Sequence, residues 1–148
     1  MIKIILADDH SIVRYIIKRF ISEEEDLMVC GEAENGKQVL EMLKDNVFDL
    51  LILDLNLPDM NGLELINKMK DLNLITPVLI LSVCPEEQFA VNAIKAGASG
   101  YLNKLNTSEN LITAIKKILM GGYYISPNLC DNLVTIINHT NSYNYNRN

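Results

Sequence analysis

The sequence has no tryptophan, only three cysteines and no long hydrophobic run. Cys30, Cys84 and Cys130 are far apart and form no CxxC pair, which argues against a disulfide framework and against a zinc site. Free thiols fit a reducing compartment, so we expect a cytoplasmic location. No segment approaches the roughly 18 apolar residues of a transmembrane helix, and the N-terminus does not follow the pattern of a signal peptide. We therefore expect no membrane partner.

Basic charge is also scarce, because 13 Lys and Arg residues stand against 19 Asp and Glu residues and give a net charge of −6. This balance counts against a large nucleic-acid-binding surface in this chain. The 148 residues are 49% apolar and 22% charged, as in ordinary globular proteins. A chain of this length buries enough surface to fold as one domain without disulfides.

Short aliphatic segments alternate with amphipathic ones along most of the chain. Five segments are predicted to be strands: 2–7, 28–33, 48–54, 78–82 and 99–102. Three of them are almost continuously apolar, which is typical of strands that are covered by helices on both faces of a parallel sheet. Each strand is followed by apolar residues at helical spacing. The sequence therefore predicts an α/β protein with a (βα)5 doubly wound parallel sheet.

The pattern changes after the fifth predicted helix, which Gly121 and Gly122 end. Ser126 and Pro127 form a helix-starting pair. Apolar residues then recur at helical spacing: Leu129, Leu133, Val134 and Ile137. The predicted organisation is a domain over 1–122, a short extra C-terminal helix or linker helix over 123–137, and a polar disordered tail or linker start over 138–148.

Polar residues follow four of the five predicted strands, which are otherwise apolar. They are Asp8 and Asp9 after the first strand, Asp54 at the end of the third, Ser82 at the end of the fourth and Lys104 after the fifth. In an open α/β sheet, ligands bind beyond the carboxyl ends of the strands. Each residue alone has an ordinary structural explanation, such as a helix cap, a turn or a surface lysine. Their coincidence at matching strand ends favours a site.

The expected chemistry of this site follows from its charges. Two carboxylates about 4 Å apart repel each other by roughly 4 kcal/mol at an effective dielectric constant of about 20, so three of them require a cation. Mg²⁺ prefers carboxylate oxygens and phosphate oxygens. With Mg²⁺ bound, Asp54 could act as a nucleophile that forms an aspartyl phosphate, Lys104 would neutralise phosphoryl oxygens, and Ser82 would donate a hydroxyl group.

Four sequence segments carry a resemblance to a known family: ILADDH at 5–10, LLILDLNLPDMNGLEL at 50–65, PVLILS at 77–82 and KAGASGYLNK at 95–104. Over about residues 1–122 the chain resembles a response regulator receiver domain. The run GASGYLNK, with the later YYISP, is similar to the NarL/FixJ-like branch. Members of that branch usually carry a C-terminal helix-turn-helix output domain, which these 148 residues do not include. A chain cut at the linker and a natural stand-alone receiver both remain open.

The resemblance implies a flavodoxin-like fold and a phosphorylation-dependent signalling switch rather than an enzyme. A sensor histidine kinase would donate the phosphoryl group to Asp54. The Mg²⁺ ligands would be Asp9, Asp54 and the carbonyl of Asn56, with Asp8 contributing directly or through water. Ser82 and Tyr101 would form the switch, with Tyr101 swinging into the space that Ser82 vacates. The implied output is transcription regulation, in which DNA is contacted only through an output domain.

Two other functions are weighed against this one. The first is a receiver-like binding module with an inert acceptor site. The second is a Mg²⁺-dependent phosphohydrolase of the haloacid-dehalogenase kind, which needs an acidic residue two positions after its nucleophile, where this chain has Asn56. A homodimer through the first and fifth, or the fourth and fifth, predicted helices also remains open.

Overall fold

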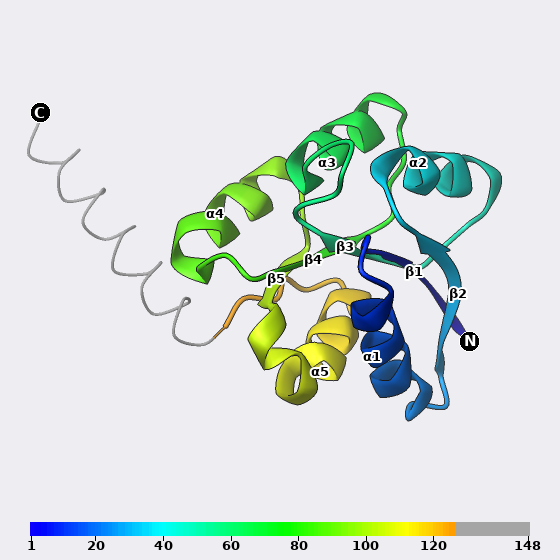
Figure 1. Cartoon of the computed structure of the whole chain (residues 1–148), viewed down its shortest axis with the longest axis vertical. Helices are drawn as coiled ribbons and strands as arrows, with labels where there is room; N and C mark the ends of the chain where they lie inside the picture. Colours follow the sequence, from blue (N-terminus) through cyan, green and yellow to red (C-terminus); the bar gives the residue numbers. More distant parts are fainter. Residues whose placement is uncertain (127–148) are drawn as a thin grey trace, which may run out of the picture.

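The computed structural model describes residues 1–126, apart from the side chains of 86–88. It contains one parallel sheet with helices on both faces (Figure 1). The strands are β1 (Ile2–Ala7), β2 (Leu27–Ala33), β3 (Leu50–Asp54), β4 (Val78–Ser82) and β5 (Gly100–Asn103), and their order is β2-β1-β3-β4-β5. The helices are α1 (Ser11–Ser22), α2 (Gly36–Asp45), α3 (Gly62–Asp71), α4 (Glu86–Ala96) and α5 (Thr107–Leu119), with the 3₁₀ helix η1 (Lys104–Asn106) after β5. The predicted flavodoxin-like (βα)5 architecture is confirmed.

The core consists of two layers, one on each face of the sheet. Helices α1 and α5 cover one face, and α2, α3 and α4 cover the other (Figure 1). Every residue of β3 and of β4 is buried, which explains why these strands read as unbroken apolar runs. Among the described helices, none has the length and hydropathy that a membrane span requires.

Side-chain caps fix where two of the helices begin. The Asn35 side chain accepts a hydrogen bond from the backbone N–H of Gln38 at the start of α2, and the Asn61 side chain caps α3 in the same way. The carboxylate of Asp59 also accepts hydrogen bonds from the backbone N–H groups of Gly36 (2.8 Å) and Lys37 (3.0 Å). The loop after β3 is thereby attached to the start of α2.

The folded part of the chain continues past residue 122. Tyr124 forms a parallel bridge with Gly100. The Tyr124 N–H donates a hydrogen bond to the Ser99 carbonyl, and the Tyr101 N–H donates one to the Tyr124 carbonyl; both have a length of 3.0 Å. Tyr124 is only 6% exposed. The extra or linker helix was predicted over 123–137, but its first four residues, 123–126, are not helical. The rest of that range, 127–137, and the predicted tail over 138–148 lie outside the described residues.

Truncating a buried strand residue should destabilise the fold strongly. Ile52 lies in β3 and is 0% exposed, so Ile52→Ala should lower the free energy of unfolding by about 2–5 kcal/mol through lost burial and a residual cavity. Urea denaturation measures this change. Ile75 is 93% exposed, and Ile75→Ala should change the free energy by about 0.5 kcal/mol or less. Equal losses in the two variants would contradict this packing.

Candidate functional site

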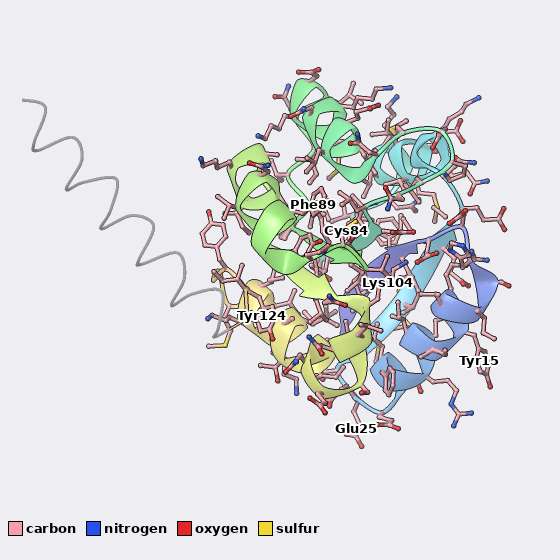
Figure 2. All side chains as sticks on the ribbon, turned by 60° about the vertical axis from the view of Figure 1, so that its left-hand side comes forward. Tyr15, Glu25, Cys84, Phe89, Lys104 and Tyr124 are labelled. Atoms are coloured by element: carbon pink, nitrogen blue, oxygen red, sulfur yellow. The ribbon has the colours of Figure 1, made fainter. Side chains whose placement is uncertain are left out.

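The parallel strands bring their carboxyl ends to one edge of the sheet, and the predicted polar residues meet there. Asp8 follows β1, Asp54 is the last residue of β3, and Ser82 is the last residue of β4. Lys104 begins η1 directly after β5 and lies at this end of the sheet, as does Cys84 (Figure 2). Asp8, Asp54 and Ser82 are buried, with exposed fractions of 1%, 5% and 0%.

Lys104 joins two of the carboxylates. Its Nζ lies 2.9 Å from Asp8 Oδ2 and 3.3 Å from Asp54 Oδ2. All three side chains are at least 84% removed from solvent, since Lys104 is 16% exposed. A charge pair that is shielded from water in this way interacts more strongly than a surface pair. Lys104 therefore holds the ends of β1, β3 and β5 together.

The backbone around Lys104 is fixed by two residues that the sequence analysis missed. Thr107 Oγ1 donates a 2.8 Å hydrogen bond to the Lys104 carbonyl, and Asn103 Oδ1 accepts a 2.9 Å hydrogen bond from the Leu105 N–H. No peptide bond within residues 1–126 is cis, so the bond between Lys104 and Leu105 is trans. The only signal in the sequence was the polar side chains that flank Lys104, and such residues are common in any turn.

The environment of Asp54 shifts its ionisation. Burial raises the pKa of Asp54 above its ordinary value, and the nearby negative charge of Asp8 raises it further. A hydrogen bond from the Asn56 N–H (3.2 Å) and the positive charge of Lys104 act in the opposite direction without cancelling the effect. Asp54 is consequently a carboxylate that gains from further positive charge at the site.

The acidic cluster suits a divalent cation. Asp8, Asp9, His10 and Asp54 each offer a ligand atom, and these atoms all lie within 4.8 Å of one another. Three of the four are carboxylate oxygens, which is the donor type that Mg²⁺ prefers. The sequence analysis did not include His10 in the site, yet its Nδ1 lies 3.0 Å from both Asp8 Oδ1 and Asp9 Oδ1. Asn56 adjoins the cluster through its N–H, and the ligand role of its carbonyl stays a prediction.

The two predicted switch residues are linked through Cys84. Ser82 Oγ accepts a 3.0 Å hydrogen bond from the Cys84 N–H, and the Tyr101 hydroxyl donates a 3.1 Å hydrogen bond to the Cys84 carbonyl. Tyr101 was predicted to swing inward when the site is phosphorylated. It is already 0% exposed, packed within the layer that α2, α3 and α4 cover. Inward burial of Tyr101 therefore needs no phosphoryl group.

Comparison with known proteins gives a consistent family. The family model described as "response regulator receiver domain" matches residues 4–116. The nitrate/nitrite response regulator protein NarL of Escherichia coli K12 is 40% identical over 123 residues, which are 83% of this chain and 57% of that protein. The transcriptional regulatory protein DegU of Brevibacillus brevis is 34% identical over 90% of this chain and 56% of its own length. The chain thus spans little more than half the length of these relatives.

Solved structures agree. A LuxR-family two-component response regulator from Aurantimonas sp. SI85-9A1 superposes with a TM-score of 0.83 at 30% identity, covering 90% of this chain and 95% of that chain. The signal receiver domain of a NarL protein from Mycobacterium tuberculosis superposes with a TM-score of 0.75 at 29% identity, covering 81% of this chain and 97% of that chain.

Neutralising Asp54 should stabilise the protein at neutral pH. The pKa of Asp54 is higher in the folded state than in the unfolded state. Its negative charge therefore lowers the free energy of unfolding when the pH is above the folded-state pKa, and has no effect when the pH is below the unfolded-state pKa of about 4. Asp54→Asn should raise the free energy of unfolding at pH 7 by on the order of 1 kcal/mol, and the gain should shrink as the pH falls. Denaturant titrations across this pH range measure the difference.

Asp59→Asn is the matched control with the opposite sign. Burial alone raises the pKa of Asp59, but the N–H groups of Gly36 and Lys37 outweigh it and lower the pKa overall. Its charge therefore stabilises the fold above the unfolded pKa, and this contribution is lost as the pH falls through the folded pKa. Asp59→Asn should lower stability at pH 7 and have little effect in acid. Stability changes of the same sign in both variants would refute these two pKa shifts.

Proposed function

Because the chain belongs to the response regulator receiver family, whose members are phosphoryl-accepting switches of two-component systems, we propose that Asp54 is its phosphoryl acceptor. The observation that carries this proposal is the position of Asp54. Its carboxylate ends β3, is 5% exposed, and lies 3.3 Å from the Lys104 ammonium within an acidic cluster. We infer that the donor is the phosphohistidine of a sensor histidine kinase.

The proposed transfer uses groups that already surround Asp54. An Asp54 carboxylate oxygen attacks phosphorus, a new O–P bond forms, and the N–P bond to the donor imidazole breaks with its electron pair returning to that nitrogen, which takes up a proton from solvent. The Asn56 N–H holds Oδ1, and Lys104, beside Oδ2, is placed to neutralise a phosphoryl oxygen. The two contacts hold the carboxylate in one orientation, which reduces the entropic cost of the transfer.

The acidic cluster next to Asp54, whose ligand atoms could hold a metal ion, supports the same proposal. Asp8, Asp9 and Asp54 would hold Mg²⁺ together with the Asn56 carbonyl. When bound, the ion offsets the negative charge that develops during phosphoryl transfer. Within the described residues, one lysine, Lys104, contacts two of the three carboxylates, so negative charge exceeds the positive charge that it supplies. Asn56 stands where a phosphohydrolase would need an acid, which disfavours that alternative.

The output side of the switch is proposed to begin at Ser82. Its hydroxyl would turn toward the phosphoryl group, which would release the Cys84 N–H and change the loop that Tyr101 holds through the Cys84 carbonyl. Because Tyr101 is already buried, phosphorylation would stabilise one arrangement of this loop rather than drive the ring inward. The expected readout is a change at the surface of α4, which begins at Glu86, two residues after Cys84.

The proposed cellular role follows from the relatives. NarL is described as a nitrate/nitrite response regulator and DegU as a transcriptional regulatory protein. We infer transcription regulation as the output of this switch, with any DNA contact made by an output domain outside these 148 residues. We also propose that phosphorylation favours a homodimer. The proposed location of the protein is the cytoplasm.

Acceptance of one phosphoryl group tests the proposal. After incubation with a small acyl phosphate and Mg²⁺, the intact mass of the wild-type chain should increase by one phosphoryl group and no more. Asp54→Asn should show no increase, and chelation of Mg²⁺ should reduce labelling at least tenfold. Asp54→Asn is expected to be the more stable protein, so its failure to label would not reflect unfolding.

Asp59→Asn serves as the matched control because Asp59 lies in the loop after β3 but outside the acidic cluster. This variant should label like the wild type. Labelling of Asp54→Asn, or continued turnover of the acyl phosphate with no stable product, would reject the switch in favour of another acceptor or a hydrolase. A wild-type chain that neither labels nor binds Mg²⁺ would identify the inert module.

The relay from Ser82 makes a separate prediction. Ser82→Ala should still accept a phosphoryl group, but the phosphorylation-dependent change in amide hydrogen exchange over 83–96 should fall at least fivefold, in keeping with typical coupling of 5–150-fold. Val83 is 66% exposed, and Val83→Ala should leave that change intact. A full exchange response in Ser82→Ala would show that the signal leaves the site by another route.

A further inference from the structure

Residues 123–126 extend the sheet beside β5 in a strand-like manner. The bridge between Gly100 and Tyr124 sets the register, and Figure 2 labels Tyr124 at this edge. Tyr124 packs in the layer covered by α1 and α5, whereas Ile125 packs against the layer covered by α2, α3 and α4. Alternation between the two faces is the side-chain pattern of a strand.

An apolar groove lies between this segment and α4. It is lined by Ala90, Val91, Ile94, Lys95, Tyr123 and Ile125 and has a volume of about 150 Å³. Five of the six lining residues are aliphatic or aromatic, and Tyr123 is 63% exposed. A groove of this composition suits apolar side chains from a helix better than a charged small molecule.

The adjoining part of the chain has side chains of the kind that would fill the groove. Segment 127–137 lies outside the described residues and follows Ile125 after a single residue, Ser126. Its apolar residues recur at helical spacing. As a helix its 11 residues would extend about 16 Å, which is the length of the 11-residue α4. Because Tyr123 and Ile125 line the groove themselves, the connection keeps this segment at high local concentration.

We propose that segment 127–137 binds in this groove, with its apolar side chains against Val91 and Ile94. The chain would then cover part of its own α4 surface. A second copy or another protein that uses this face of α4 would have to displace the segment first. This inference concerns only the packing of the chain and does not depend on phosphoryl transfer at Asp54.

Disulfide trapping with the native Cys130, which lies inside the segment, tests the proposal in the full chain. In a Cys30→Ser, Cys84→Ala background, a second cysteine is introduced by Ile94→Cys at the groove. Asn92→Cys provides the matched control, because Asn92 is exposed on the same helix and does not line the groove. A disulfide needs Cα atoms about 4.4–6.8 Å apart. Under mild oxidation at low protein concentration, without Mg²⁺ or phosphodonor, the position-94 variant should form an intramolecular disulfide at least tenfold faster than the position-92 variant.

A second substitution checks that apolar packing causes the trapping. Leu133→Asp, added to the Ile94→Cys variant, should slow disulfide formation at least tenfold, and Val91→Cys replaces Ile94→Cys if the latter does not fold. Equal rates at positions 92 and 94, or no disulfide at the groove, would overturn the proposal. Disulfides between two chains would also overturn it, and would assign the groove to a second copy of the protein.

Discussion

The ammonium group of Lys104, shared between Asp8 and Asp54, is the interaction on which the site depends. It joins the ends of three strands and reduces the repulsion between two buried carboxylates. It does not remove that repulsion: burial and Asp8 still raise the pKa of Asp54, and Asp9 adds a third carboxylate to the cluster. Asp8 and Asp54 are buried and share one ammonium group, so negative charge stays in excess between them, whereas Asp9 is exposed beside them. That excess is what a divalent cation and an electrophilic phosphoryl group would relieve.

A continuous set of hydrogen bonds leads from Ser82, at the end of β4, to the C-terminal end of the described chain. Ser82 Oγ accepts a hydrogen bond from the Cys84 N–H, and the Cys84 carbonyl accepts a hydrogen bond from the Tyr101 hydroxyl. The backbone N–H of Tyr101 in turn donates to the Tyr124 carbonyl. A change in the loop at Cys84 can therefore reach both α4 and the segment that follows α5. The contacts provide a physical route for a switch, and the hydrogen-exchange experiment over 83–96 tests its first part, from Ser82 to α4.

Much of this structure could be predicted from the sequence. Strands 2–7 and 78–82 were placed at their observed bounds, because buried strands of a parallel sheet are nearly continuous apolar runs; Lys3 is the exposed exception in the first. The proximity of Asp8, Asp54 and Lys104 could be predicted, because parallel strands bring their carboxyl ends to one edge of the sheet, and their roles in phosphoryl transfer stay predictions. The bridge at Tyr124 was not predicted, since the short run Tyr123-Tyr124-Ile125 between glycines and a Ser-Pro pair shows no alternation of polar and apolar residues. The inward position of Tyr101 was also missed, because its side-chain direction is set by the tertiary contact with Cys84.

The most direct test of the account is to locate the phosphoryl group chemically. Borohydride reduces an aspartyl phosphate to homoserine, and peptide mass spectrometry then identifies the modified position in the labelled wild-type chain. The account predicts homoserine at position 54 and at no other aspartate. Homoserine at Asp8 or Asp9, or a phosphoryl group on His10 with position 54 unmodified, would contradict it.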